Sequence, residues 1–138
     1  MKRLYMIIVI CVAAIFASSC SKNNGPEPST IVTEFYTAVT TMKFDDAAKY
    51  CVEGAMDEYI NGYKEAFEAL VAKDKKLAAK VEEKAAQTTI TIGEVTKEKE
   101  VRTVDFTLAD DSGNTKEKTA VLKKVEKEWK IAEIKDKQ

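Results

Sequence analysis

Histidine is absent from this chain of 138 residues, and cysteine, proline, glycine and tryptophan are scarce, with three, two, five and one copies. Without histidine, the chain has no imidazole to activate a serine or cysteine nucleophile. It also has no imidazole ligand for a metal. We find no glycine-rich phosphate loop and no serine-nucleophile elbow. The sequence therefore contains no motif for phosphoryl or acyl transfer.

An excess of charge of one sign is also lacking. The chain carries 22 basic and 23 acidic side chains, and its formal net charge is −1. A nucleic-acid-binding protein needs a concentrated basic face, so we expect no nucleic-acid partner. Acid pairs four residues apart, such as Glu53 and Asp57, have no histidine or cysteine companion and are typical of a solvated helix face. We expect no bound metal and no cofactor.

Long hydrophobic runs are limited to residues 4–17, which is short for a membrane span of about 20 residues. This run follows Lys2 and Arg3 and ends in small residues before Cys20, an order typical of a secretory signal. An uncleaved membrane anchor is the alternative, although the Ala-Ser-Ser-Cys ending has no use in such an anchor. No second run of that length follows, so we expect the remainder to be soluble.

The cysteine placed directly after these small residues makes the segment resemble a bacterial lipoprotein signal. The resemblance implies that residues 1–19 are removed and that the thiol of Cys20 takes up lipid, which makes the membrane a partner. Ser21 differs from the aspartate that retains some lipoproteins at the inner membrane, and no acidic run of the kind linked to surface export follows. We therefore expect an exported protein on the periplasmic side of an outer membrane.

Residues 20–28 are polar, contain one glycine and two prolines, and are interpreted as a flexible tether. Residues 29–138 are then long enough for one domain with one core. Cys11 would be lost with the signal, so Cys51 is left without an intramolecular partner. We interpret Cys51 as a small buried hydrophobic residue on a helix, and the core must stabilise the domain without a disulfide.

Apolar residues at helical spacing predict three helical regions. The first begins near Ser29, which with Thr30 is a candidate N-cap. Asp45 is a candidate N-cap for a second helix that continues through Cys51. A long third region covers residues 56–87, and it is expected to kink or divide at Gly62 or at the charged residues 73–76.

The pattern changes to strands from Thr88 onward, because β-branched residues and alternating polarity replace the helical spacing. The predicted strands cover 88–95, 101–109, 115–125 and 129–134. Gly93 indicates a bulge, residues 97–100 a hairpin tip, and residues 110–114 a turn. Helices followed by strands predict an α+β fold, with N-terminal helices packed on one face of a C-terminal antiparallel sheet of about four strands.

Three stretches resemble a known family. Residues 31–39 are Ile-Val-Thr-Glu-Phe-Tyr-Thr-Ala-Val, and residues 44–50 are Phe-Asp-Asp-Ala-Ala-Lys-Tyr. Residues 121–131 are Val-Leu-Lys-Lys-Val-Glu-Lys-Glu-Trp-Lys-Ile. They look like the opening helices and the closing hairpin of the nuclear transport factor two-like fold, a cone-shaped α+β roll shared by ketosteroid isomerase-like and polyketide cyclase-like domains. More narrowly, the chain is similar to small Gram-negative lipoproteins that carry such a domain on a lipidated tether.

The resemblance implies a conical pocket, in which isomerase-type members use a carboxylate base with a tyrosine or a protonated aspartate. The candidates by residue type are Tyr36, Tyr50, Tyr59, Tyr63, Asp57 and Asp105. Tyr59 and Tyr63 share a helix face, and core packing with the hydroxyls at the rim is their alternative role. Asp105 should point away from the face of Val104 and Phe106, so it is buried only if that face is not the one covered by helices.

The candidate pocket-lining residues are Tyr36, Tyr59, Tyr63, Phe67 and Trp129. Trp129, on the predicted closing strand, could stack on a ligand or anchor the core.

Three functions remain open at this point. The leading hypothesis is a lipid-anchored, non-enzymatic domain that binds a small apolar ligand or a protein. The second is a small isomerase- or cyclase-like enzyme acting on an apolar molecule. The third is an inhibitor or accessory subunit that docks, or forms a homodimer, through its sheet face.

Overall fold

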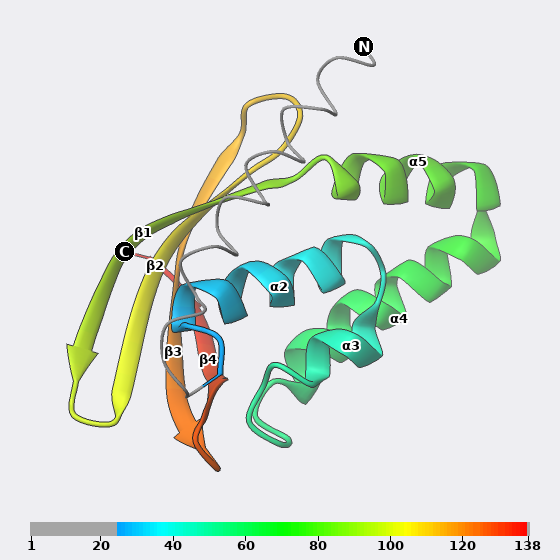
Figure 1. Ribbon diagram of the computed structural model, residues 1–138. Coiled ribbons are helices and arrows are strands. Elements are labelled where there is room, and N and C mark those ends of the chain that lie inside the picture. Colours follow the sequence, from blue (N-terminus) through cyan, green and yellow to red (C-terminus); the bar gives the residue numbers. More distant parts are fainter. Residues whose placement is uncertain (1–24, 138) are drawn as a thin grey trace.

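The structure, a computed structural model, describes residues 25–137 (Figure 1). The predicted signal peptide, Cys20 and the tether as far as Asn24 lie outside the described residues. Within the described part, no helix is both long enough and apolar enough to cross a membrane.

Helices come first and strands last, which confirms the predicted α+β class. The helices are α2 (Pro28–Thr40), α3 (Phe44–Ala48), α4 (Asp57–Lys73) and α5 (Lys75–Ala86). The strands are β1 (Thr89–Glu98), β2 (Val101–Ala109), β3 (Thr115–Val125) and β4 (Glu128–Asp136). They form one open sheet in the order β1-β2-β3-β4, in which every neighbouring pair is antiparallel.

Helix α2 begins at Pro28, one residue before the predicted domain boundary. The N-cap position is occupied by Glu27, whose side chain makes no capping bond. The predicted N-caps Ser29 and Thr30 instead lie inside the helix. Proline suits the first helical position because its fixed φ is already helical and its missing N–H would have no helical partner there. The helix packs its apolar stripe against the sheet, and Val32 and Phe35 are fully buried.

Cys51 is buried and unpaired, as expected, but its predicted place on a helix is wrong. Helix α3 ends at Ala48, and Cys51 forms an isolated parallel bridge with Ile131 of β4. The N–H of Val52 donates to the carbonyl of Ile131 at 2.8 Å, and the N–H of Ile131 donates to the carbonyl of Tyr50 at 2.9 Å. These bonds to the edge strand pair backbone groups that would otherwise need another partner.

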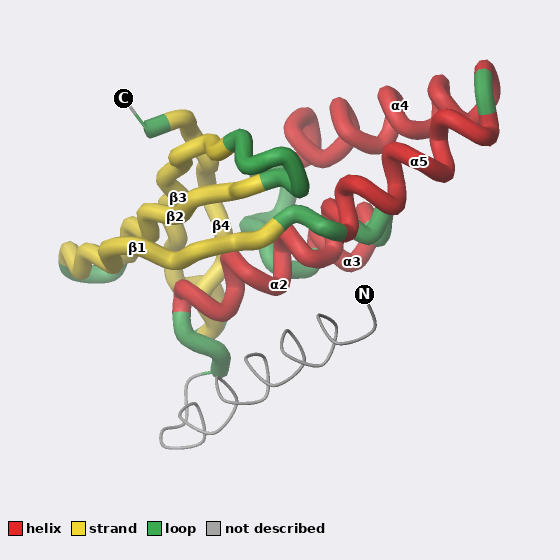
Figure 2. The backbone as a smooth tube through the Cα atoms, turned by 90° about the horizontal axis from the view of Figure 1, so that it is seen from above, coloured by secondary structure: helices red, strands yellow, loops and turns green. Residues whose placement is uncertain are grey.

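The long helical region divides at Asp74, within the charged patch where a break was expected, whereas Gly62 lies inside an uninterrupted α4. The Asp74 carboxylate caps α5 by accepting from the N–H groups of Lys76 at 3.0 Å and Leu77 at 3.1 Å. Helices α4 and α5 run side by side and extend away from the strands (Figure 2).

The core lies between the helices and one face of the sheet. Its fully buried sheet residues include Val104, Phe106, Ala120, Leu122 and Ile131. Every residue of the core cluster lies between Ile31 and Ile131, so the part of the chain from Gly25 onward carries the whole described core.

Two predicted local features of the sheet are confirmed. The register of β1 against β2 shifts between Ile92 and Val95, which places a bulge at Gly93. A Cβ atom at Gly93 would lie 3.2 Å from the carbonyl oxygen of Asp105, so glycine allows this close approach. The β2–β3 turn is held by Asp110, whose carboxylate accepts from the N–H groups of Ser112 and Asn114, each at 2.9 Å.

Candidate binding groove

A groove of about 500 Å³ lies between the helices and the β2–β3 end of the sheet. We call it the helical groove. Its apolar lining comes from α2, the α2–α3 link, α3, α4, α5 and β2, and consists of Val39, Met42, Phe44, Ala66, Phe67, Leu70, Val81, Ala85 and Leu108. Its polar lining consists of Tyr36, Thr40, Tyr63, Thr88, Asp110, Asn114, Lys116 and Lys118.

The walls contributed by α4 and α5 are only partly covered by the rest of the described chain. Ile60 is the buried residue of α4 and Ala78 that of α5. Tyr63 and Val81, which line the groove, remain 45% and 38% exposed, and Leu77, one turn before Val81, is 46% exposed. Helices of this length are marginal in water without a packed apolar face. An apolar molecule in the groove would therefore bury surface that these helices leave exposed.

One end of the groove is polar, because the β2–β3 hairpin brings two lysines and the Asp110 turn to it. The ammonium of Lys118 donates to the Asp136 carboxylate at 2.6 Å, and the Lys118 side chain is only 12% exposed. Asp110 accepts from side-chain and backbone donors of Asn114, and then of Ser112, which lowers the pKa of its carboxyl. Lys116 has no carboxylate within 4.0 Å among residues 25–137.

Three tyrosine hydroxyls form a chain beside the groove. The hydroxyls of Tyr36 and Tyr59 are 2.6 Å apart, and those of Tyr59 and Tyr63 are 3.4 Å apart. Burial raises the pKa of both Tyr36 and Tyr59 above the ordinary range, so these phenols stay protonated at neutral pH. At Tyr63, this chain of hydroxyls can offer the groove a hydrogen-bond donor or acceptor.

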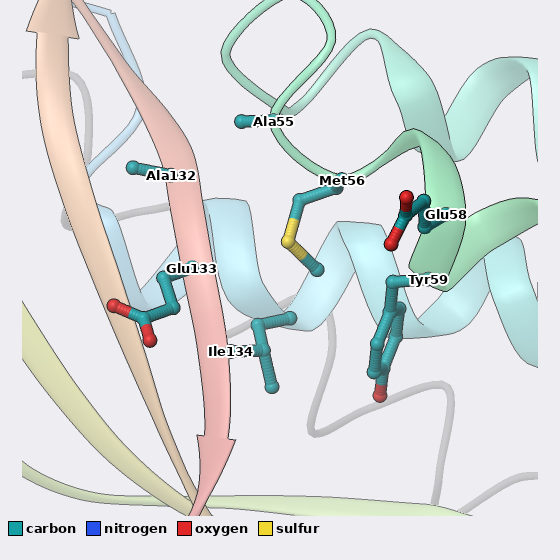
Figure 3. Close-up of a pocket in the computed structure, with 7 residues that line it drawn as sticks. All are labelled: Ala55, Met56, Glu58, Tyr59, Ala132, Glu133 and Ile134. Atoms are coloured by element: carbon teal, nitrogen blue, oxygen red, sulfur yellow. The ribbon is translucent and has the colours of Figure 1, made fainter.

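A second, shallower hollow of about 430 Å³ lies between the start of α4 and β4 (Figure 3). Met56 and Ile134 point toward one another there, and Tyr59 stands beside them. Glu133 projects to the other side of β4, whereas the Glu58 carboxylate lies on the α4 side (Figure 3). The helical groove has the larger and more apolar lining, and we treat it as the candidate site.

The structure brings most of the candidate pocket residues to one place. Tyr36, Tyr63 and Phe67 line the helical groove. Tyr59 lines the shallower hollow and contacts Tyr36 through its hydroxyl. Trp129 is buried elsewhere on the inner face, where the Arg102 guanidinium carbon lies 4.6 Å from its ring centroid.

The remaining sequence candidates do not lie at the groove. Asp105 is on the sheet face opposite Val104 and Phe106, where it accepts from the Thr119 hydroxyl at 2.8 Å and pairs with Lys137 at 3.1 Å. Asp57 is exposed at the start of α4, and Tyr50 packs beside the core near Cys51. Residues 25–137 contain no group of three or more cysteine, aspartate or glutamate side chains placed to hold a metal.

Sequence reasoning missed Lys116 and Lys118 as groove residues. A signal was present, because both share the two-residue period of Ala120 and Leu122 in β3 and must face the same side. Their partners confirm this, since Lys116 stands opposite Leu108 and Lys118 opposite Phe106.

No family model matches the chain, and no curated protein matches it in sequence. Among solved structures, the chain is similar to the solution structure of a SEC-C motif containing protein from Rhodopseudomonas palustris. The TM-score is 0.55 at 11% identity, over 80% of this chain and 79% of that one. At this identity the likeness concerns the fold alone.

Proposed function

We propose that this chain is a lipid-anchored, non-enzymatic binding domain that takes a small apolar molecule into the helical groove. The observation that carries the proposal is the partly exposed apolar lining from α4 and α5 around a groove of about 500 Å³. This volume falls in the range of small-molecule sites, which are mostly apolar with a few polar groups. Nine of the 17 residues that line the groove are apolar, and the other eight supply its polar groups.

The enzyme alternative requires a buried carboxylate that faces a tyrosine. Asp105, the acid that could have met this need, lies on the opposite face of the sheet and pairs with Lys137. Asp110 is exposed at the groove and is occupied by its own turn. The tyrosine chain is then better suited to orienting a ligand than to proton transfer.

The binding proposal is tested with N-phenyl-1-naphthylamine, a neutral probe whose fluorescence rises in apolar sites. Residues 25–138, which carry the whole described core, should bind the probe. Val81→Glu places a charge in the groove and should weaken binding at least about tenfold. Val95→Glu is the matched control, because Val95 is 37% exposed and lies on β1 outside the groove. Equal probe binding by both variants would rule out the groove as the site.

The anchor and the family belong to the same proposal. We propose that residues 1–19 are a signal peptide, that Cys20 carries lipid on the periplasmic side of an outer membrane, and that the domain is of the nuclear transport factor two-like type. The run of small residues before Cys20 supports the first two points. In a Gram-negative host the full chain should partition with membranes and incorporate labelled palmitate, and Cys20→Ala should lose both properties. A Cys20→Ala chain that still incorporates palmitate would contradict lipidation at Cys20.

A further inference from the structure

We infer that the ligand of the helical groove is a long-chain monocarboxylic acid, whose carboxylate binds Lys116 and whose chain runs between α4 and α5. This inference rests on the proposed binding function and adds the chemical class of the ligand. It follows from the hydrogen-bonding groups at one end of the groove and from the apolar length of the remainder.

Among its charged groups, the polar end offers a free donor but little free acceptor capacity. The Lys118 ammonium is held by Asp136 at 2.6 Å. The Asp110 carboxylate already accepts four bonds from Ser112 and Asn114, at 2.9–3.0 Å. Lys116 is exposed and has no carboxylate within 4.0 Å among the described residues. An ammonium with unused donors matches an anionic oxygen and repels a cationic group.

A carboxylate also fits the charge balance at this end better than a doubly charged head does. Asp136 offsets Lys118, and Asp110 keeps its own negative charge close to the site. The two lysines and two aspartates at this end sum to zero, so a singly charged head leaves a net charge of −1 beside the Lys116 ammonium and a doubly charged head leaves −2. The nearby chain of tyrosine hydroxyls does not change this balance, because burial keeps Tyr36 and Tyr59 protonated.

The apolar remainder of the groove is elongated. On α4 the lining continues from Tyr63 to Leu70, which is about 10 Å at 1.5 Å per residue. On α5 it includes Val81 and Ala85, and the exposed Leu77 extends the same helix face by one more turn. A linear chain would follow this stripe beyond the groove and cover Leu77, which a compact ligand confined to the groove would leave exposed.

The test compares dodecanoic acid with dodecanol, which has the same chain and no charge, as competitors of bound N-phenyl-1-naphthylamine. On residues 25–138 at low salt, the acid should displace the probe at a concentration about fivefold lower than the alcohol does. The advantage should shrink in high salt, because an exposed ion pair is screened. Dodecyl phosphate tests a doubly charged head in the same assay.

Lys116→Gln should remove the acid's advantage over dodecanol, and Lys116→Arg should restore most of that advantage. Lys135→Gln is the matched control, because Lys135 is also exposed but stands opposite Thr119, on the other face of the sheet.

Equal displacement by acid and alcohol on the unaltered protein would overturn the inference even if Lys116→Gln failed to fold. Tighter binding of dodecyl phosphate would also overturn it, and both results leave the proposed function standing. Failure of the probe and all competitors to bind would instead overturn the proposed function together with the inference.

Discussion

The hydroxyl of Tyr36 on α2 lies 2.6 Å from the hydroxyl of Tyr59 on α4. This bond joins α2 to α4 through two residues that lie 23 positions apart in the sequence. The Tyr36 ring also packs on Phe106 of β2, with ring centroids 5.1 Å apart, and Phe35 packs near Tyr59 at 6.3 Å. Tyr36 therefore connects the sheet, α2 and the start of α4, and it fixes one wall of the helical groove.

Removal of the Tyr59 hydroxyl should destabilise the domain measurably. Tyr59→Phe leaves the hydroxyl of Tyr36, a residue that is 1% exposed, without its partner. An unsatisfied buried hydroxyl costs about 1–3 kcal/mol, so the free energy of unfolding should fall by about that amount. Urea denaturation followed by circular dichroism measures the change.

Tyr63→Phe is the matched control for Tyr59→Phe. The Tyr63 hydroxyl is 3.4 Å from that of Tyr59, and its side chain is 45% exposed, so water can replace the lost contact. We expect a loss below about 0.5 kcal/mol. Equal losses of unfolding free energy in the two variants would mean that the bond between Tyr36 and Tyr59 contributes no more than the exposed contact between Tyr59 and Tyr63.

Stability should decline in mildly alkaline solution. Burial raises the pKa of the Cys51 thiol from its ordinary 9.0 to about 12, and it raises those of Tyr36 and Tyr59. Above about pH 9 the unfolded chain releases these protons while the folded chain keeps them. The folded state then binds more protons than the unfolded state, so the free energy of unfolding falls as the pH rises.

Urea midpoints measured between pH 8 and pH 10.5 test this expectation. The midpoint should be flat near pH 8 and should fall progressively above about pH 9. Cys51→Ala removes one of the titrating groups and should make the decline shallower. A midpoint that stays constant to pH 10.5 would show that these groups titrate alike in the folded and unfolded states.

Much of the fold could be predicted because its signals are local. The alternation in β2 and β3 gave the observed strand limits, and the turn residues after Ala109 define the hairpin between them. The break at Asp74 was expected because a charged patch interrupts the apolar spacing. The end of α3 was mispredicted because a non-local bridge from Cys51 to Ile131 replaces the next helical turn.

The candidate site was less predictable, because a groove depends on how helices are placed relative to one another. Residue type and helical spacing were enough to single out Tyr36, Tyr63 and Phe67, which line the groove. Neither property shows that α4 and α5 extend away from the sheet and leave Val81 partly exposed. The lysines of β3 were overlooked because a charged residue on an inward-facing position is usually assigned to solvent.

The Asp74 cap should control the order of α5. Asp74→Ala removes the acceptor for the N–H groups of Lys76 and Leu77, which should cost about 1 kcal/mol. Because Ala78 is the buried residue of α5, the loss should mainly increase local opening of that helix. Amide hydrogen exchange should quicken in α5 and stay unchanged in β2 and β3. Asp74→Asn keeps a side-chain acceptor and should preserve protection, so faster exchange in both variants would argue against capping.

The Arg102–Trp129 contact offers a test with a built-in reporter, because Trp129 is the one tryptophan of the sequence. The Arg102 guanidinium carbon lies 4.6 Å from the ring centroid, closer than the Lys124 ammonium at 5.4 Å. Arg102→Gln should therefore destabilise the domain by about 0.5–1 kcal/mol and shift the tryptophan emission to the red as water reaches the ring.

Lys124→Gln should have a smaller effect, because the side chain is exposed and its charge is farther from the ring. Arg102→Lys should be intermediate, since lysine keeps the charge but loses the planar group and its bonds to the carbonyls of Lys99 and Val101. If Arg102→Gln and Lys124→Gln give the same emission and the same stability, the stacking contact contributes no more than an exposed charge does.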